Sequence, residues 1–261
     1  MKLCRFVLQS DPSVPRSGLF FEDNVYETDG VKALGIYSLD KVRFLAPLRQ
    51  PPTVRIFDAS EGRNGHALHY HYANPTRMGG PMSEFDVPPF IRNLEFTVRV
   101  GVVMKDAGAE IDASEAFPFI LGFATVLGFQ CTEHLVQEVR QGLHWGRSRD
   151  FPLVVGPFLT TPEELEDKHR ATSDGRLFEW GYTLRVNGEE IAHQKVTMEH
   201  SFESMLAYAS AGTELQVGDL IAGPELPRPA LPSTTLKRYL QPGDTLQVGV
   251  EPLGLLTVKI V

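Results

Sequence analysis

The sequence predicts a mainly β fold of the α+β class, with few short helices. Short apolar or alternating runs recur along the chain, and each run is bounded by Gly, Pro, Asn or Asp, which is the pattern of β-strands. Helical spacing of apolar residues is confined to brief segments. The expected strands are Lys2–Leu8, Val42–Ala46, Leu94–Met104, Ile120–Phe129, Phe178–Val186, Ile191–Thr197, Thr245–Val250 and Leu255–Val261.

Local signals place a hairpin and three helices within this pattern. Val186-Asn187-Gly188-Glu189 separates two strand runs, and Asn-Gly favours the positive φ angles of a type I′ hairpin turn. Thr132–Gly142 and Ser201–Ser210 have apolar residues at helical spacing. Thr161-Pro162-Glu163-Glu164 begins a short helix, because it offers an N-cap residue, Pro at the first helical position and a following Glu.

The length of 261 residues allows one large domain, or a small one followed by a large one. We place a boundary near Arg49-Gln50-Pro51-Pro52, which gives a small N-terminal β domain over residues 1–50 and a larger domain over residues 51–261. A segment of about 50 residues is too short to be counted on to fold alone.

Composition argues against a nucleic-acid-binding protein, a disulfide-rich protein, a zinc protein and a membrane protein. The formal net charge of −8 gives no diffuse attraction to phosphate backbones, so we expect no nucleic-acid partner. Cys4 and Cys131 cannot form a disulfide framework, and no Cys/His spacing indicates zinc. Ala116–Thr132 carries no charge, but it contains Pro118 and two glycines and is short for a membrane span, so we interpret it as a buried strand. Without an apolar signal block near Met1, we expect a cytoplasmic protein that has no membrane partner.

Several motifs of the second part of the chain resemble the fumarylacetoacetate hydrolase family, including its 2-hydroxyhepta-2,4-diene-1,7-dioate isomerase-like members. The resemblance extends from about Val54 to Val261, with the motifs in family order. They are Tyr72-Ala73-Asn74-Pro75, Gly80-Pro81, Arg149-Asp150-Phe151, Gly156–Leu165, Arg185–Glu189, Val217–Ile221, Leu240–Asp244 and Leu253-Gly254.

The resemblance implies a fold, an assembly and a chemistry. The fold would be a flattened, mixed and mostly antiparallel β-roll behind a small N-terminal β domain, and the protein would be a homodimer. Family enzymes cleave, isomerise, hydrate or decarboxylate 2-oxo and 1,3-dicarbonyl acids, and a divalent cation such as magnesium or manganese polarises the oxo oxygen. The cation is held by a Glu-x-Glu pair on one strand and an Asp on a later one.

This chain departs from the family at those cation ligands. Alignment puts Thr97 and Arg99 at the Glu-x-Glu positions and Gly128 at the Asp position. A fixed guanidinium at a cation site opposes binding of the cation, so we expect neither a metal nor another cofactor. A two-residue slip would bring Glu95 to a ligand position and still leave one carboxylate. We expect Glu95 to be a surface or edge residue paired with a base.

The other transferable positions are altered as well. Arg63 falls where related members have the His of a general-base pair, and arginine is not a base near pH 7. Arg149 replaces the family's Lys, and Ala222-Gly223-Pro224-Glu225 matches its glycine-threonine turn only loosely. The catalytic residues are therefore unknown.

Four residues are candidates for binding a small anionic metabolite: Thr97, Arg99, Arg149 and His144. Arg99 and Arg149 would clamp a carboxylate directly, because guanidinium matches carboxylate in a bidentate way. His144 precedes Arg149 in a loop that lines the substrate mouth in the family. The alternative is that Arg99 pairs internally with an acid and fills a dead cavity.

His69 and His71 share a face if their segment is extended, and such a pair could ligate a transition metal. No third ligand can be identified from spacing, which favours packed or solvated histidines. They are therefore not among the candidate site residues.

Three functions stay open. The first is a diverged family member that binds a small 2-oxo or 1,3-dicarbonyl acid and catalyses a metal-independent hydrolysis or isomerisation. The second is a catalytically inactive homologue with a binding or regulatory role, for example by pairing with an active paralogue. The third is an ordinary magnesium- or manganese-dependent C–C bond hydrolase or isomerase. The sequence does not identify the substrate.

Overall fold

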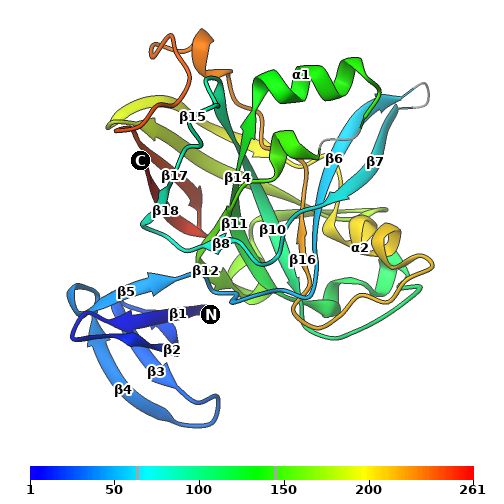
Figure 1. Ribbon diagram of the computed structural model, residues 1–261. Helices are drawn as coiled ribbons and strands as arrows, with labels where there is room; N and C mark the ends of the chain where they lie inside the picture. The colour runs from blue at the N-terminus through cyan, green and yellow to red at the C-terminus, as the bar shows by residue number, and fades with distance from the viewer. Residues whose placement is uncertain (63–64, 144–145) are drawn as a thin grey trace.

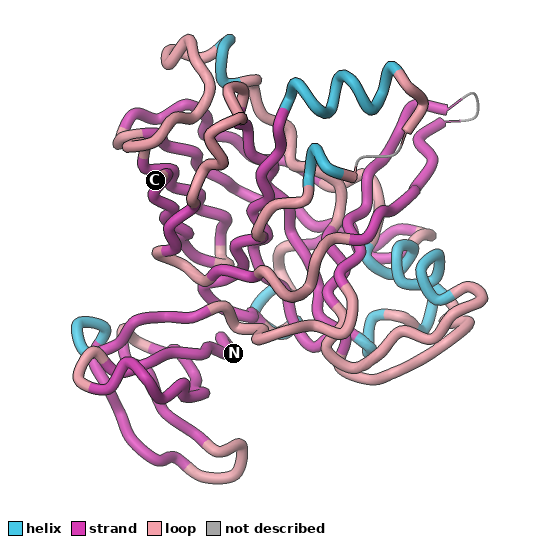
Figure 2. Tube along the Cα trace, viewed as in Figure 1, coloured by secondary structure: helices cyan, strands magenta, loops and turns pink. Residues whose placement is uncertain are grey.

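The computed structural model describes residues 1–62, 65–143 and 146–261 of the chain. Its strands form two mixed sheets, with α-helices only at the periphery (Figures 1 and 2). The larger sheet has the order β4-β3-β2-β1-β12-β11-β10-β16-β6-β7, with β5 on β1 and β8 on β12. The smaller sheet has the order β13-β14-β17-β18-β9, with β15 on β14. The mainly β fold class predicted from the sequence is confirmed.

The N-terminal strands form an antiparallel meander at one end of the larger sheet (Figure 1). A small hydrophobic core around Phe6 and Val25 packs on the meander, and Phe158 of β12 contributes to it. It joins the rest of the molecule where Leu3 of β1 pairs with Leu159 of β12. The division of the chain into two domains at residue 50 stays a prediction. The meander strands are β1 (Lys2–Leu8), β2 (Asp11–Phe21), β3 (Asn24–Thr28), β4 (Ala33–Ser38) and β5 (Val42–Leu45).

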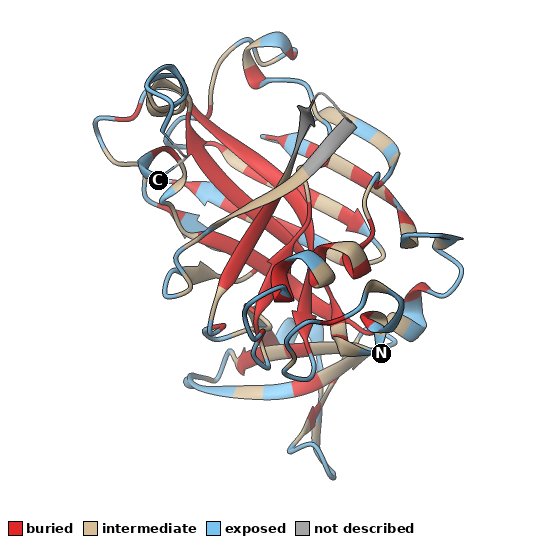
Figure 3. Ribbon diagram, turned by 90° about the vertical axis from the view of Figure 1, so that its right-hand side faces the viewer, coloured by how far each residue is buried: buried red, intermediate tan, exposed pale blue. Residues whose placement is uncertain are grey.

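The centre of the larger sheet consists of long buried strands (Figure 3). Every residue of β10 (Leu94–Met104) is buried, and all but Leu121 of β11 (Ile120–Cys131) is buried. These near-continuous apolar runs are covered on both faces, which explains why they do not alternate. The uncharged segment Ala116–Thr132 thus contains the expected buried strand, over Ile120–Cys131. No helix among the described residues is long and apolar enough to cross a membrane.

The remaining strands of the larger sheet include β16, which lies between two strands that are distant from it in the sequence. Both β6 and β10 flank β16, so three segments far apart in sequence become neighbours. These strands are β6 (Val54–Gly62), β7 (Gly65–Tyr72), β8 (Met78–Gly79), β12 (Leu153–Thr160) and β16 (Leu220–Ala222).

The smaller sheet packs its apolar face on the main core, which includes Phe123, Trp180 and Val248. The expected Asn187-Gly188 hairpin joins two of its strands, and both residues have positive φ. The strands are β9 (Ser83–Phe85), β13 (His169–Thr172), β14 (Gly175–Val186), β15 (Glu189–Thr197), β17 (Thr245–Glu251) and β18 (Gly254–Ile260).

The three expected helices are found, one of them in a tighter form. They are α1 (Thr132–Arg140), α2 (Phe202–Ser210) and the 3-10 turn η5 (Pro162–Leu165). Ser201 caps α2, because its side chain accepts a hydrogen bond from the backbone N–H of Ser204. Five further 3-10 turns are described: η1 (Leu39–Lys41), η2 (Ala113–Glu115), η3 (Phe117–Phe119), η4 (Arg147–Arg149) and η6 (Leu231–Ser233).

Candidate functional site

One carboxylate lies between two guanidinium groups inside the larger sheet. Asp58 on β6 accepts from Arg99 Nη2 at 2.7 Å through Oδ1 and from Arg149 Nη1 at 2.9 Å through Oδ2. The three side chains come from β6, β10 and the end of η4, and their exposed fractions are 13%, 2% and 14%. We call Asp58, Arg99 and Arg149 the Asp58 cluster.

Arg99 also connects three segments of backbone. Its Nη1 donates to Phe57 O at 2.6 Å and to Gly223 O at 3.0 Å. Because Gly223 begins the loop after β16, the guanidinium holds this loop against β6 and β10. Arginine suits this role, because its planar group presents several donors in a fixed arrangement.

The Asp58 cluster carries more positive than negative charge. Burial raises the pKa of Asp58, but attraction to Arg99 and Arg149 outweighs burial and holds that pKa below its ordinary value. These three side chains contribute one negative and two positive charges, and the Glu225 carboxyl also interacts electrostatically with both guanidinium groups. A buried excess charge of this kind attracts an anion more strongly than a surface charge does, since water screens it less.

His71 on β7 borders the cluster, with Nδ1 3.6 Å from Asp58 Oδ2. Burial, followed by repulsion from Arg149, lowers the pKa of His71 to about 4 despite the attraction of Asp58. The imidazole is therefore neutral near pH 7 and does not change the charge of the cluster.

Thr97 and Gly128 lie beside the cluster and face each other. They are directly opposite in the β10–β11 ladder, and a Cβ atom added to Gly128 would be 2.9 Å from Thr97 Oγ1. The space lined by Thr97, Arg99, Gly128 and Arg149 measures only about 20 Å³. This volume holds about one water molecule, so a substrate does not fit there.

A cleft of about 390 Å³ borders the cluster at Asp58. Asp58 lines this cleft together with residues 196–200 and 224–227. The volume is in the range of small-molecule sites. We call this space the Asp58 cleft.

Glu225 adds a second carboxyl group to the Asp58 cleft. Its Oε1 lies 3.3 Å from Nε of Arg228, and its side chain is 30% exposed. Burial raises the pKa of Glu225, and Arg228, Arg99 and Arg149 oppose that rise without cancelling it. A carboxyl group with a raised pKa at a cleft is a candidate for proton transfer near neutral pH.

The structure brings three of the four predicted binding residues together. Thr97, Arg99 and Arg149 line one small cavity, whereas His144 lies outside the described residues, as does Arg63. The Arg99–Asp58 pair is the internal acid contact that the sequence left as an alternative. Anion binding by these residues stays a prediction.

The structure tests two expectations for Glu95: its pairing with a base and its position in the fold. Glu95 pairs with a base, as expected, since its Oε2 lies 3.2 Å from Nη2 of Arg228. Its expected position at the surface or at a sheet edge is wrong, because only 10% of its side chain is exposed and β10 lies between β11 and β16. Glu95 Oε1 also accepts from the backbone N–H of Leu231, so this carboxylate fastens a loop.

The donor atoms of the site do not suit a divalent cation. Among residues 1–62, 65–143 and 146–261, no group of three or more His, Cys, Asp or Glu side chains could hold a metal ion. Asp58 already accepts from two guanidinium groups, and Thr97 and Gly128 bring at most one neutral oxygen. The expectation that the protein uses no cofactor stays a prediction.

Two residues of the site were missed from the sequence. The first is Asp58, which directly follows the mostly apolar run Val54–Phe57, and a charge next to such a run is a signal for burial with a partner. Glu225 was seen only as a mismatch in a turn. Its value as an acid depends on Arg228, three residues later, and on segments distant in sequence.

Comparisons with known proteins agree with this architecture. The family model for the fumarylacetoacetate (FAA) hydrolase C-terminal region matches residues 53–261. The chain belongs to the fumarylacetoacetate hydrolase family. Human mitochondrial oxaloacetate tautomerase FAHD2B is 27% identical over 275 residues, which cover 96% of this chain and 82% of that protein.

Solved structures of family members share the fold over the whole chain. The 5-carboxymethyl-2-hydroxymuconate delta-isomerase of Mycobacterium smegmatis has a TM-score of 0.76 at 19% identity and covers 100% of this chain and 99% of its own. The fumarylacetoacetate hydrolase of Exiguobacterium antarcticum has a TM-score of 0.77 at 19% identity, with the same coverage.

Proposed function

We propose that this protein is a metal-independent tautomerase or isomerase of a small 2-oxo or 1,3-dicarbonyl carboxylic acid. In this proposal Thr97, Arg99 and Gly128 have replaced the cation-holding carboxylates of the family. The observation that carries it is the position of the Asp58 cluster, in which two guanidinium groups flank the one carboxylate that lines the cleft. Similarity to an oxaloacetate tautomerase supports a tautomerisation among the reactions of the family.

Tautomerisation of a 2-oxo acid moves only one proton, so it requires few catalytic groups. One proton leaves the carbon next to a carbonyl and one proton reaches the carbonyl oxygen, so composition and oxidation state are unchanged. The reaction needs a proton-transfer group and a positive field that stabilises the enolate. Both are present at the Asp58 cleft, where Glu225 and the Asp58 cluster meet.

We assign the proton transfer to Glu225. In its ionised form the carboxylate removes the proton from carbon, and in its protonated form it delivers that proton to the oxygen. A carboxyl group whose pKa is raised by burial is a stronger base once ionised than an exposed carboxylate, which favours the first of these steps. Arg99 and Arg149 stabilise the negative charge of the intermediate through the field of the cluster, while Asp58 keeps them in position.

A second candidate function is supported by one specific observation. The Arg99 guanidinium makes its contacts within the protein, to Phe57 O, Gly223 O and Asp58. This is the pattern of a residue that stabilises the fold, and it favours a catalytically inactive homologue with a binding or regulatory role.

The test is keto–enol conversion of oxaloacetate, followed by ultraviolet absorbance in excess EDTA. We expect the wild-type protein to accelerate the conversion without added metal, and Glu225→Gln to lower kcat by about 10²–10⁴-fold. Glu179→Gln is the matched control, because this exposed carboxylate on β14 lies outside the cleft, and its kcat should equal that of the wild type.

The other outcomes contradict the proposal. No acceleration of oxaloacetate or of a panel of acylpyruvates, with EDTA or with added metal, would establish the inactive homologue. Acceleration only with magnesium or manganese would establish the ordinary metal-dependent enzyme. Equal kcat values for Glu225→Gln and the wild type would remove Glu225 from the reaction.

A further inference from the structure

The loop that follows β16 runs along strand β10 and carries Glu225 of the Asp58 cleft. Two backbone N–H groups of this loop, at Gly223 and Leu226, donate to carbonyl groups of β10 at 2.8 Å. A third carbonyl group of β10, Phe96 O, accepts from the Arg228 side chain. Strand β10 therefore holds the loop on both sides of Glu225, and the second of these attachments is made by a charged side chain.

Arg228 is buried, and its guanidinium contacts one carboxylate on β10 and another in its own loop. Its side chain is 5% exposed, and Cζ lies 4.5 Å from the centre of the Phe96 ring. Nη2 is 3.2 Å from Glu95 Oε2, and Nε is 3.3 Å from Glu225 Oε1. Because Glu95 Oε1 also accepts from the backbone N–H of Leu231, the Glu95–Arg228 pair is held in one orientation.

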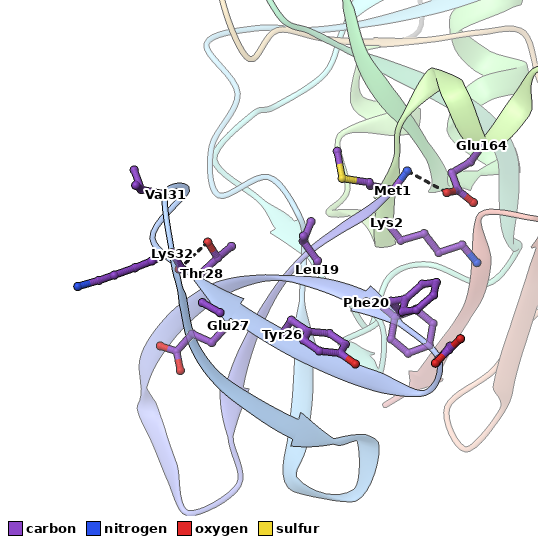
Figure 4. Close-up of a pocket in the computed structure, with 13 residues that line it drawn as sticks. Met1, Lys2, Leu19, Phe20, Tyr26, Glu27, Thr28, Val31, Lys32 and Glu164 are labelled. Carbon is purple, nitrogen blue, oxygen red and sulfur yellow. Dashed lines mark hydrogen bonds and ion pairs between the residues drawn. The ribbon is translucent and has the colours of Figure 1, made fainter.

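The Glu225 carboxyl is left available for a ligand, as comparison with Glu27 shows. Glu27 lines a larger space, of about 640 Å³, on the N-terminal meander (Figure 4). Its Oε1 accepts from Arg16 at 2.9 Å and its Oε2 from Tyr37 at 2.9 Å, so the fold uses both oxygens. Within the described part of the chain, Glu225 accepts no hydrogen bond, although Arg228 lies beside it. Arg228 thus supplies a charge to Glu225 without occupying its oxygens.

Arg228 is the main counter-charge of Glu225. Burial raises the pKa of Glu225, and Arg228 opposes this rise more than any other charge. Arg99 and Arg149 act in the same direction as Arg228, and Asp58 acts in the direction of burial. The other titratable side chains on the elements around the cleft are Glu95, His69, His71, Tyr182, Glu199 and His200.

We propose that Arg228 is a positioning residue, which Glu95 holds in place so that it fixes the Glu225 carboxylate at the Asp58 cleft and supplies its counter-charge. This inference rests on the proposed function, in which Glu225 transfers the proton. Arg228 is not among the described residues that line the cleft, so it acts through Glu225 and not on the substrate. Its charge favours the ionised carboxylate that takes the proton from carbon. Glu95 limits this effect, because it shares the charge of Arg228.

Two substitutions should move the pH dependence of kcat/KM in opposite directions. Arg228→Met removes the counter-charge, so the pKa of Glu225 should rise and kcat/KM at acidic pH should fall about tenfold. Glu95→Gln leaves the charge of Arg228 to Glu225 alone, so the pKa of Glu225 should fall and the acidic limb should move to lower pH. Keto–enol conversion of oxaloacetate in excess EDTA between pH 4 and pH 8 measures both limbs.

Arg228→Lys separates a positioning role from a merely structural one. Lysine keeps the charge but lacks the planar group that bonds Phe96 O, so Arg228→Lys and Arg228→Met should lose similar amounts of thermal stability. Only Arg228→Met should move the pH profile. Arg16→Met and Glu27→Gln break the corresponding pair on the meander, and as matched controls they should leave the profile unchanged.

Glu95→Gln keeps the test open if circular dichroism shows that Arg228→Met is unfolded. An amide oxygen at this position still accepts from the N–H of Leu231, so this variant should fold. Its acidic limb must then lie below that of the wild type, and an unmoved limb overturns the proposal.

Carbon-13 NMR of the glutamate carboxyl groups measures the titration of Glu225 without turnover, and Glu225→Gln identifies its signal. The midpoint should move up in Arg228→Met and down in Glu95→Gln. These shifts in a protein that does not convert oxaloacetate would support the role of Arg228 and contradict the proposed function. Turnover with an unmoved midpoint, or with shifts in the same direction in both variants, overturns the role of Arg228 and leaves the proposed function standing.

Discussion

Two buried ion clusters on the same strand show how a structural site differs from a candidate functional one. Arg55 and Asp58 both lie on β6, and each meets partners from distant segments. Arg55 pairs with Asp219 at 3.1 Å, and their side chains are 3% and 1% exposed. This pair is neutral, and its members do not line the Asp58 cleft. The Asp58 cluster has two guanidinium groups for one carboxylate, and its Asp58 lines that cleft.

Hydrogen bonding separates the two sites in the same way. Asp219 accepts from the backbone N–H groups of Thr53 and Gln216 as well as from Arg55, so it stabilises a turn and the start of β6. Asp58 accepts from side chains alone among its assigned hydrogen bonds. Charge balance and access to solvent thus distinguish Asp219, which stabilises the fold, from Asp58, which lies at a cleft.

The largest expected effect is on folding, from Asp219→Ala. This change leaves Arg55 charged and buried and removes the acceptor of two backbone N–H groups, so it should lower the free energy of unfolding by about 3–5 kcal/mol. Urea unfolding measures the loss.

The comparison variant is Asp58→Asn, which should cost less, about 1–3 kcal/mol. Arg99 keeps two backbone acceptors in this variant, and Arg149 is 14% exposed and can reach solvent. A larger loss for Asp58→Asn than for Asp219→Ala would contradict the distinction between the two sites.

The next expected effect is a pH dependence of the free energy of unfolding, caused by His71 beside the Asp58 cluster. The pKa of His71 is about 4 in the folded protein and 6.5 in the unfolded chain. Between these values the unfolded chain binds a proton that the folded protein does not. The free energy of unfolding should therefore fall by up to about 3 kcal/mol as the pH is lowered from 6.5 to 4.

His71→Gln should flatten this part of the curve, whereas His193→Gln, at a 69% exposed side chain, should leave it unchanged. Urea unfolding at intervals between pH 4 and pH 7 makes the measurement. Parallel curves for the wild type and His71→Gln would show that His71 titrates normally.

The sequence predicted the fold better than the site, for physical reasons. Buried strands such as β10 and β11 can be predicted from the sequence, because each is a long and mostly apolar run. Strand β2 was missed because Pro12 and Pro15 argue against a strand, although pairing on both sides holds it in place.

The candidate site depends on contacts that no local pattern contains. Resemblance to the family indicated Arg99 and Arg149, but their common partner lies 41 and 91 residues away. Only the neighbouring positions of β6 and β10 around β16 reveal that Asp58 joins them. The charge of the cluster, and hence its chemistry, could not be counted before that partner was known.

The smallest expected effect tests the central claim most directly. If excess positive charge at the Asp58 cluster attracts an anion, then removing its one negative charge should strengthen anion binding. Calorimetric titration of oxalate in excess EDTA should show binding to the wild type, and about tenfold tighter binding to Asp58→Asn at 25 °C, where that variant is still folded. Equal or weaker binding to Asp58→Asn, or binding only after manganese is added, would contradict the account.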